Sequence, residues 1–292
     1  MNSLYKEISP AKLNLFLEVL NRRQDGFHNL ESFMTFCQAG DLICVNKSNE
    51  FKLTINGQFA NFLNNADNII NKAVSSMEHL YKRKFNVNII LEKNLPISSG
   101  MGGGSSNAAT VIRAIHNIFK LEENENLLSS LLSLGADVPF CYYGKSAVIQ
   151  GVGERLKFIN HELEDHHILL VNPMKEVSTN LIFNKLNFKT KIKDSKKNIY
   201  KNINLDYLIS RKNTLEMIAI DELQEIRKIL QFLKTKTKSQ LSRMTGSGAT
   251  CFAIYETHES LNEAESLIKF KFPSYWICST QLVNSICDIK LV

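Results

Sequence analysis

The 292-residue sequence has no apolar run long enough to cross a bilayer, a span that needs about 20 consecutive apolar residues. Its first residues, Met-Asn-Ser-Leu-Tyr-Lys-Glu, are polar and charged where a secretory signal would be apolar. Apolar residues make up 44% of the chain and charged residues 22%, as in ordinary globular proteins. We therefore expect a cytoplasmic protein with no membrane partner and with a substantial buried core.

Closely spaced metal ligands are also missing. The six cysteines form no Cys-x-x-Cys pair, and no His-Glu-x-x-His pattern occurs. Several cysteines stand beside aromatic residues, which favours burial. We predict that they are reduced core thiols and assign no residue as a metal ligand; the cysteines are Cys37, Cys44, Cys141, Cys251, Cys278 and Cys287.

Charge of one sign is only slightly in excess, at a net +6. Much of this excess lies between residues 185 and 201, where seven lysines occur without any arginine. The favoured interpretation of this stretch is a solvated loop, and a nucleic-acid patch is the alternative. We therefore expect no nucleic-acid partner, although a positive balance also suits a site for nucleotide polyphosphates.

Two common phosphate-binding loops are absent. The dinucleotide fingerprint fails because Ser105 stands where a third glycine must follow Gly100 and Gly102. The Walker loop fails because Pro139 stands five residues before Gly144. The chain has instead the segment Leu95-Pro-Ile-Ser-Ser-Gly-Met-Gly-Gly-Gly-Ser-Ser-Asn-Ala-Ala-Thr110.

The segment 95–110 has the composition of a phosphate cradle, because glycine lets successive backbone N–H groups converge on an anion. Small and apolar residues then recur at helical spacing up to Phe119. This spacing predicts a helix that begins near Ser105 and whose N-terminal N–H groups and dipole face the glycines. A flexible surface loop is the alternative, but the segment lies between a predicted strand at 85–91 and this helix, where many enzymes bind phosphates.

Periodicity along the rest of the chain predicts strands and helices without regular alternation, which indicates the α+β class. Alternating apolar residues predict strands at 13–20, 41–45, 51–55, 146–149, 167–171, 250–254 and 274–280. Helical spacing predicts helices at 67–80, 127–134, 205–209 and 223–233. No internal repeat occurs, and the region 151–160 is the best candidate for a domain boundary.

Three segments resemble the motifs of the galactokinase, homoserine kinase, mevalonate kinase and phosphomevalonate kinase superfamily. In chain order they are Ser9-Pro-Ala-Lys-Leu-Asn-Leu-Phe-Leu17, Pro-x-x-x-Gly-x-Gly-Gly-Gly-Ser-Ser at 96–106, and Met244-Thr-Gly-Ser-Gly-Ala-Thr-Cys-Phe252. Longer strings are similar to one branch only, the kinases of a cytidyl-linked methylerythritol in the non-mevalonate isoprenoid pathway. These strings are Arg22-Arg-Gln-Asp-Gly-Phe-His28, Leu134-Gly-Ala-Asp-Val-Pro-Phe140 and Gly151-Val-Gly-Glu154.

The resemblance implies a ribosomal-protein-S5-like N-terminal domain at 1–157 and a ferredoxin-like C-terminal domain at 158–292. It implies that ATP and an acceptor alcohol bind in the cleft between them, and that Mg²⁺ bridges the β and γ phosphates. Other alcohol kinases of the superfamily, and a catalytically silent sensor on the same fold, are the alternatives. We expect a small-molecule substrate and a monomer or weak homodimer.

Asp137 and Lys12 are the expected catalytic pair. Asp137 stands in the otherwise apolar turn 134–140, where an unpaired buried carboxylate would be costly, so it needs a cationic or hydrogen-bonding partner. The resemblance places Lys12 beside it at the acceptor hydroxyl, with Asp137 as general base and Lys12 stabilising the alkoxide. A purely structural ion pair is the alternative.

The resemblance implies two groups of binding residues. Those for ATP are Gly100, Gly102, Gly103, Gly104, Ser105, Ser106, Asn107, Lys93, Asn68 and Ile69, and those for the acceptor are Asn14, Phe27, His28, Thr179 and Phe183. In the second group a ring stacks on cytosine while His28 bonds its polar edge. Phe27 replaces the family's usual tyrosine, which removes a hydroxyl and keeps the ring, and Met101 replaces a commoner leucine of similar volume. The alternatives are a surface position for Lys93 and core packing for Phe27 and Phe183.

Overall fold

The structure is a computed structural model, and it describes residues 4–64, 67–163, 166–186 and 203–289. Its strands are β1 Tyr5–Arg22, β2 His28–Lys47, β3 Lys52–Asn56, β4 Val87–Glu92, β5 Ala147–Gly151, β6 Arg155–Phe158, β7 His167–Asn172, β8 Leu241–Met244, β9 Cys251–Tyr255 and β10 Trp276–Val283. Its α-helices are α1 Ile69–Tyr81, α2 Gly103–Phe119, α3 Leu127–Leu134, α4 Val138–Tyr143, α5 Thr179–Asn184, α6 Leu205–Ile209, α7 Glu216–Glu222, α8 Gln224–Lys236 and α9 His258–Lys271. Two short 3-10 helices are η1 Ala60–Phe62 and η2 Ile286–Asp288. Most of the lysine-rich stretch, at 187–201, lies outside the described residues.

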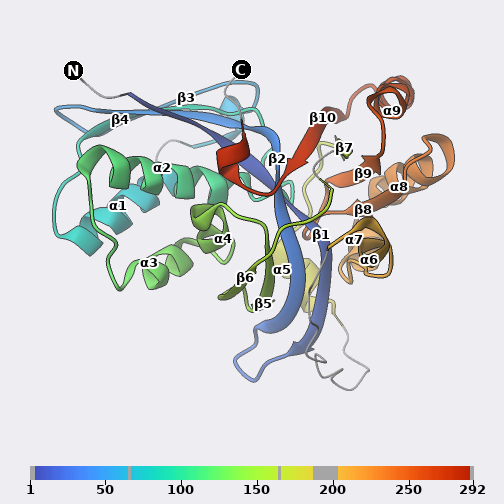
Figure 1. Cartoon of the computed structure of the whole chain (residues 1–292), viewed down its shortest axis with the longest axis horizontal. Coiled ribbons are helices and arrows are strands. Elements are labelled where there is room, and N and C mark those ends of the chain that lie inside the picture. Colours follow the sequence, from blue (N-terminus) through green and yellow to red (C-terminus); the bar gives the residue numbers. More distant parts are fainter. Residues whose placement is uncertain (1–3, 65–66, 164–165, 187–202, 290–292) are drawn as a thin grey trace.

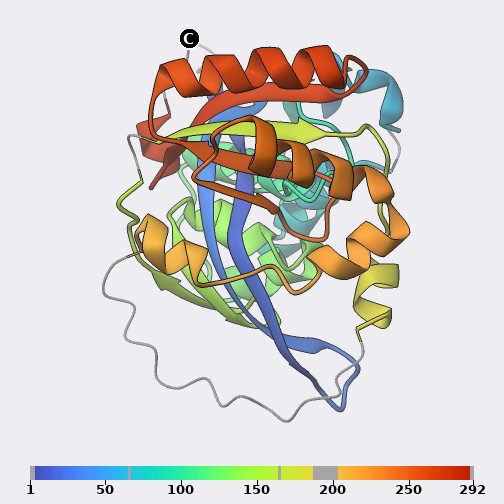
Figure 2. The same cartoon turned by 90° about the vertical axis from the view of Figure 1, so that its right-hand side faces the viewer.

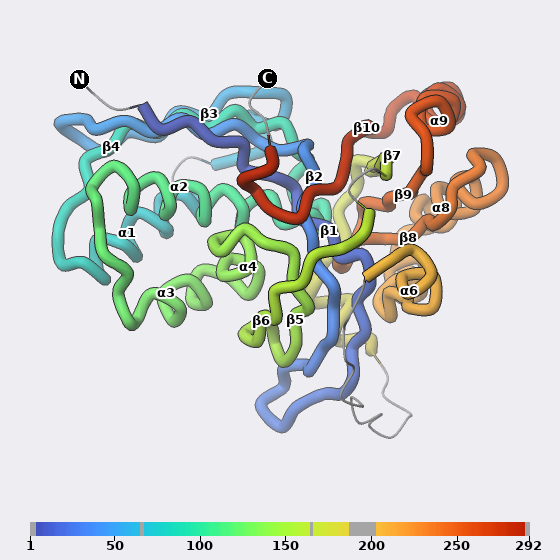
Figure 3. Tube along the Cα trace, viewed as in Figure 1, coloured from blue at the N-terminus to red at the C-terminus, as the bar shows by residue number. Residues whose placement is uncertain are grey.

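Helices α1 to α4 lie at one end of the molecule and α6 to α9 at the other, with the long β1–β2 hairpin between them (Figure 1). Within the described residues, one mixed sheet connects the two ends in the order β3-β4-β2-β10-β7-β9-β8. Strand β10 makes this connection because it pairs with β7 and then, at Leu282 and Val283, with β2. Figure 3 shows the last strand, in red, returning to the blue hairpin. This mixture of elements confirms the α+β class.

Strand β1 carries two side chains of the predicted site, Lys12 and Asn14. Its antiparallel register shifts just before Lys12 and just after Asn14. Such bulges bend a strand and re-aim its side chains. Lys12 and Asn14 are two residues apart, so they lie on the same face of β1.

Helices α1 and α2 pack their apolar faces against β2 and β4. The buried residues of α2 include Ala108, Val111, Ile112 and Ile115, whose three-to-four spacing is the pattern that predicts the helix. The helix begins at Gly103, two residues earlier than the predicted Ser105. Glycine is a poor helix former, so local sequence places the start too late, whereas the glycines themselves form the first turn here.

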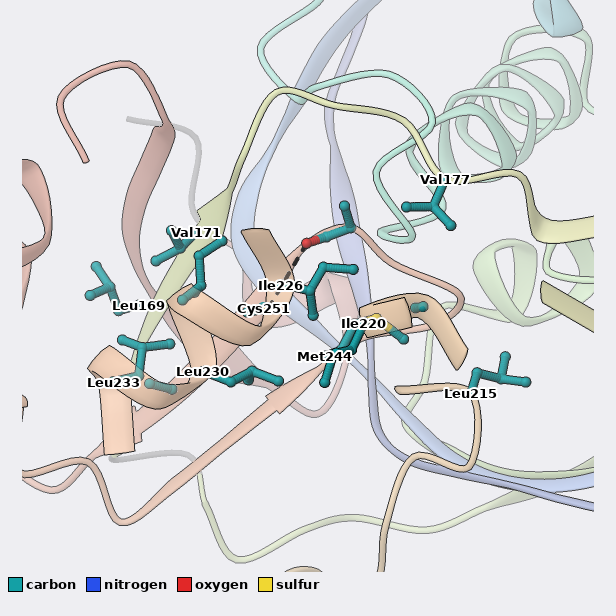
Figure 4. Close-up of a cluster of buried hydrophobic side chains, with 14 of the residues drawn as sticks. Leu169, Val171, Val177, Leu215, Ile220, Ile226, Leu230, Leu233, Met244 and Cys251 are labelled. Carbon is teal, nitrogen blue, oxygen red and sulfur yellow. Dashed lines mark hydrogen bonds between the residues drawn. The ribbon is translucent and has the colours of Figure 1, made fainter. Parts of the chain in front are cut away.

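The C-terminal end of the molecule has its own core, shown in Figure 4. Side chains alternate along β7, so that Leu169 and Val171 point toward α8 whereas Ile168 and Leu170 belong to the cluster on the other face. Helices α8 and α9 cover the outer face of this part of the sheet (Figure 2). The core anchors both ends of the loop between β8 and β9; its members include Ile226, Leu230, Leu233, Met244, Ala249 and Cys251.

Several expectations differ from the structure in detail. The turn predicted at 134–140 continues as helix α4, with Asp137 as its N-cap residue. The prediction of buried cysteines is wrong for Cys287, which is exposed in η2 near the chain end, whereas Cys37, Cys141 and Cys251 are buried. Among the described residues, no helix combines the length and apolar character that a membrane span requires.

Candidate active site

The three superfamily-like segments converge on one another through hydrogen bonds that backbone N–H groups donate. The N–H of Lys12 donates to the carbonyl of Met101 at 2.9 Å, and the N–H of Thr250 donates to the carbonyl of Ser99 at 3.2 Å. The N–H of Asn14 donates to the hydroxyl of Thr245 at 2.8 Å. Segments that are far apart in the chain therefore form one unit around the glycine loop.

Glycine is required at two positions of this unit. Gly100 has φ +77, and a Cβ there would lie 2.7 Å from the carbonyl oxygens of Gly248 and Thr245. Gly102 has φ +64, and a Cβ there would lie 2.6 Å from Cγ of Lys12. Both would be strained with any side chain. The glycine loop thus lets the third segment and the stem of Lys12 approach its backbone.

Lys12 and Asp137 form the ion pair that the resemblance implies. The distance from Lys12 Nζ to Asp137 Oδ2 is 3.0 Å, and the Lys12 ammonium also donates to Asn14 Oδ1 at 2.7 Å. The amide of Asn14 is fixed because its Nδ2 donates to Ser32 Oγ at 2.8 Å. Lys12 is 6% exposed at its side chain and Asp137 is 31% exposed. The carboxylate is therefore open to a ligand, which a sealed structural pair would not be.

The N-terminus of α2 faces the cavity with its unpaired N–H groups. Asn107, in the second turn, accepts a hydrogen bond on its Oδ1 from the Ser9 hydroxyl at 2.7 Å. Because Oδ1 of Asn107 faces Ser9, its amide nitrogen points away from Ser9. Ser106 differs from the other predicted ATP residues, because it does not line the cavity and its buried hydroxyl has no partner among the described residues.

Lys93 is buried at 3% exposure, so the surface alternative for this lysine is wrong. Its ammonium lies 2.5 Å from Oδ2 of Asp41, a fully buried carboxylate. Oδ1 of Asp41 accepts the backbone N–H groups of Asn94 and Leu95, both at 2.8 Å. Burial lowers the pKa of the Lys93 ammonium from its usual value, and Asp41 opposes this shift.

Sequence reasoning missed Asp41, which ties β2 to the start of the glycine loop. A signal for it was present, because Asp41 precedes the apolar run Leu-Ile-Cys-Val and a carboxylate buried with such a strand needs a cation or donors. The identity of the partner was not visible, since Lys93 is 52 residues further along the chain. Sequence reasoning also missed Ser9 and Ser32, whose hydroxyls orient Asn107 and Asn14.

Three rings and a hydroxyl pair form the other end of the cavity. Phe27 is 62% exposed at the hairpin tip, so core packing is wrong for this residue. The ring centroids of His28 and Phe183 are 5.3 Å apart. Phe183 also packs against the C-terminal core, so the core alternative accounts for part of its surroundings. Thr179, at the first turn of α5, shares a hydrogen bond of 2.7 Å with Ser247.

The charge state of His28 follows from its surroundings. Burial and the nearby Arg22 guanidinium lower the pKa of its imidazole. The neutral ring offers one donor and one acceptor nitrogen. A neutral imidazole of this kind can bind a polar base edge.

A cavity of about 1460 Å³ collects these residues. A pocket for one small ligand usually measures about 300–1,000 Å³, so this cavity has room for two. Apart from Ser106, every predicted site residue lines it: Lys12, Asn14, Phe27, His28, Asn68, Ile69, Lys93, Gly100, Gly102, Gly103, Gly104, Ser105, Asn107, Asp137, Thr179 and Phe183. Asn68 also caps α1, because its Oδ1 accepts the N–H of Ile70 at 2.9 Å.

The chain is similar to known proteins in sequence and in fold. The family models for the GHMP kinases N terminal domain and for the GHMP kinases C terminal match residues 68–145 and 193–273. A crystal structure of 4-(cytidine 5'-diphospho)-2C-methyl-D-erythritol kinase superposes with a TM-score of 0.77 at 25% identity, covering 95% of this chain and 99% of that one. Homoserine kinase from Cytophaga hutchinsonii shares the fold, with a TM-score of 0.73 at 15% identity over 98% of this chain and 96% of that chain.

Curated relatives match over nearly the full length. The chain is 34% identical over 290 residues to the 4-diphosphocytidyl-2-C-methyl-D-erythritol kinase of Chelativorans sp. (strain BNC1), with 98% of each chain covered. It is 34% identical over 295 residues to the kinase of the same name from Clostridioides difficile (strain 630), with 96% of each chain covered. The chain therefore belongs to the 4-diphosphocytidyl-2-C-methyl-D-erythritol kinase family.

Proposed function

We propose that this protein transfers the γ-phosphoryl group of ATP to the 2-hydroxyl of 4-diphosphocytidyl-2-C-methyl-D-erythritol, in the non-mevalonate route to isoprenoid precursors. The observation that carries the proposal is the Lys12–Asp137 pair, 3.0 Å apart and open to the same cavity as the glycine loop. The family supplies the identity of the two substrates. The cavity supplies room for both.

Asp137 is the proposed general base and Lys12 the group that stabilises developing negative charge. Asp137 takes the proton of the hydroxyl, whose oxygen attacks the γ-phosphorus in line. The bond from this phosphorus to the oxygen bridging it to the β-phosphorus breaks, so that ADP leaves and the alcohol becomes a phosphate ester. Asn14 holds the Lys12 ammonium in place through its fixed amide oxygen.

We assign the ATP phosphates to the N-terminus of α2, with backbone N–H groups of the glycine loop and Ser105 as donors. Asn107 contributes from the next turn, and Lys93, Asn68 and Ile69 lie toward the base. The Ser106 hydroxyl is not assigned to the phosphates, because Ser106 does not line the cavity.

Mg²⁺ is the proposed cofactor. The described residues contain no cluster of three or more His, Cys, Asp or Glu side chains that could hold a metal, and Asp67, Asp137 and Glu176 line the cavity. Protein-bound Mg²⁺ usually keeps several waters and binds substrate phosphates with one or two carboxylates. The residues therefore fit an ion held mainly by ATP, which neutralises charge on the β and γ phosphates.

We assign the cytidine end of the acceptor to Phe27, His28 and Phe183, with Thr179 beside the third superfamily segment. The exposed Phe27 ring is available for stacking on cytosine, and the neutral His28 ring can bond its polar edge. We further propose an S5-like domain at 1–157 and a ferredoxin-like domain at 158–292, divided just before the last residue of β6. We also propose that the protein is a monomer or a weak homodimer.

Incubation of the protein with Mg²⁺ and ATP against a panel of alcohols tests this function. The panel is the cytidyl-linked methylerythritol, free methylerythritol, homoserine and mevalonate, with ADP release measured for each. We expect turnover only with the cytidyl-linked alcohol. Preference for homoserine or mevalonate would reassign the chain within the superfamily, and nucleotide binding without turnover on any alcohol would indicate a silent sensor.

A further inference from the structure

The string Gly151-Val-Gly-Glu154 has no role in the transfer derived above, yet it forms a tightly held turn between β5 and β6. The carboxylate of Glu154 accepts the backbone N–H of Val152 at 2.6 Å. Gly151 has φ +76, and a Cβ there would lie 2.2 Å from Oε1 of Glu154. Gly151 therefore leaves the space that the folded-back carboxylate occupies.

This turn rests against the residue that precedes the catalytic base. Gly153 has φ +123, and a Cβ there would lie 3.1 Å from the carbonyl oxygen of Ala136 and 3.3 Å from its Cβ. A missing side chain thus allows two backbones to touch. Val152 and Gly153 line the same cavity as Ala136 and Asp137.

The placement of Asp137 depends on its backbone more than on its own side-chain bonds. Asp137 is the N-cap residue of α4, but its carboxylate makes no capping hydrogen bond. Its ion-pair partner among the described residues is Lys12 at 3.0 Å. A shift of the backbone at Ala136 therefore moves the carboxylate relative to Lys12 and to the acceptor hydroxyl.

We propose that Glu154 is a positioning residue for phosphoryl transfer: it locks the 151–154 turn, and the turn holds the backbone at Ala136 so that Asp137 faces the acceptor. This inference rests on the proposed role of Asp137. The two residues have different roles: Asp137 contacts the substrate, whereas Glu154 acts only through Ala136. Glu154 reaches this role from 17 residues further along the chain.

The test compares four variants by steady-state kinetics with the cytidyl-linked alcohol and ATP. A misplacement of about 1 Å in a catalytic group costs up to about a hundredfold, so we expect Glu154→Ala to lower kcat by about ten- to a hundredfold. The KM values of both substrates stay within about twofold, since the turn positions the base and not the ligands. Glu154→Gln keeps an oxygen that accepts the Val152 N–H, so it retains at least half of the wild-type kcat.

Gly153→Ala probes the same contact from the other side, because the new methyl group pushes on the Ala136 carbonyl. It lowers kcat in the same way as Glu154→Ala. Arg155→Ala is the matched control. It removes the guanidinium whose Nε lies 3.9 Å from Glu154 Oε1, on a side chain that is 65% exposed, and it leaves kcat unchanged. Thermal unfolding of each variant shows that the protein is folded at the assay temperature.

Unchanged kcat in Glu154→Ala, or raised KM with unchanged kcat, would overturn the positioning role. Loss of kcat in Glu154→Gln as large as in Glu154→Ala would also overturn it, because the hydrogen bond would then be irrelevant. The proposed function fails on a different result, namely a wild-type chain with no activity on the cytidyl-linked alcohol. The two failures are therefore distinguishable in one set of assays.

Discussion

The two ends of the cavity are built in opposite ways. At the reaction end, Lys12 and Asn14 are buried, fixed by hydrogen bonds, and enclosed by backbone that only glycine permits. At the proposed cytidine end, Phe27 is 62% exposed on a hairpin tip and His28 meets Phe183 ring to ring. Hydrogen bonds and closely packed backbone fix the side chains of the first end, whereas the second end consists of ring side chains.

The difference predicts where substitutions are tolerated. Exchange of Phe27 for the tyrosine that the resemblance leads us to expect changes only an exposed ring edge, so nothing behind it must move. A side chain at Gly100 or Gly102 would displace backbone or Lys12. We therefore expect substitutions at the reaction end to change kcat or folding, and substitutions at the cytidine end to change one KM.

Asp137→Asn gives the largest expected effect on turnover. The amide has the same shape but cannot take the proton, and loss of a general base costs about a hundred- to ten-thousandfold in rate. ATP affinity, measured by titration calorimetry, stays nearly unchanged because the phosphates are assigned to α2. A variant that keeps more than a third of wild-type kcat would remove Asp137 from the role of base.

Asp41→Asn tests whether the proposed ATP-binding part of the cavity is held in place by its buried charges. Lys93 would keep a buried ammonium without its counter-charge, and breaking a buried pair in this way costs about 3–5 kcal/mol of unfolding free energy. Urea unfolding measures the loss. Glu263→Gln is the matched control, because Glu263 pairs with Lys238 on the surface and its loss leaves the unfolding midpoint unchanged. Equal urea unfolding midpoints for both variants would contradict a stabilising role of the Asp41–Lys93 pair.

Gly103→Val is expected to weaken ATP binding. A branched side chain at the first residue of α2 crowds the Lys93 ammonium, which lies 3.3 Å from the position of a Cβ, and obstructs the assigned phosphate donors. Loss of a hydrogen bond to a charged group costs about 1.5–3 kcal/mol, so the KM for ATP rises roughly ten- to a hundredfold. Gly104→Ala gives the graded comparison and a smaller rise, since among the described residues its Cβ would meet Ile69 alone, at 3.7 Å. An unchanged ATP affinity in a folded Gly103→Val variant would place Gly103 away from the contact.

Phe27→Ala tests the cytidine end. Loss of stacking on a base is worth about 1–3 kcal/mol, so the KM for the cytidyl-linked alcohol rises by the corresponding factor while the KM for ATP stays constant. Phe27→Tyr keeps the ring and is tolerated. Because Phe27 is 62% exposed, the thermal unfolding temperature of the alanine variant stays unchanged. Equal damage to both KM values would leave the stacking assignment without support.

The smallest expected effect is a pH dependence from His28. Burial and Arg22 lower the pKa of this imidazole, so it stays neutral down to a pH below the ordinary imidazole value of about 6.5. The KM for the cytidyl-linked alcohol is therefore flat between pH 7 and 8 and rises as the pH falls through the lowered pKa, where the ring loses its acceptor. His28→Asn abolishes the acidic rise. A KM that instead changed between pH 7 and 8 would contradict a neutral His28.

Local periodicity was sufficient for some elements and insufficient for others. Helices α3 and α6 have the bounds that their apolar spacing predicts, Leu127–Leu134 and Leu205–Ile209. Helix α9 was missed although Thr257 caps it, because Phe270 is 89% exposed and Leu267 43% exposed. Apolar side chains on the solvent face blur the pattern that indicates an amphipathic helix.

The α+β class and the glycine-rich segment ahead of α2 could be predicted from the chain's local spacing. The Lys12–Asp137 ion pair could be predicted because both residues lie in short motifs that resemble those of the superfamily. The folded chain alone shows that Asp41 holds Lys93, that Ser9 orients Asn107, and that the 151–154 turn rests on Ala136. These contacts join residues between 17 and 98 positions apart. Contacts at such separations are set by strand register and by the approach of one backbone to another, and local side-chain periodicity carries no record of either.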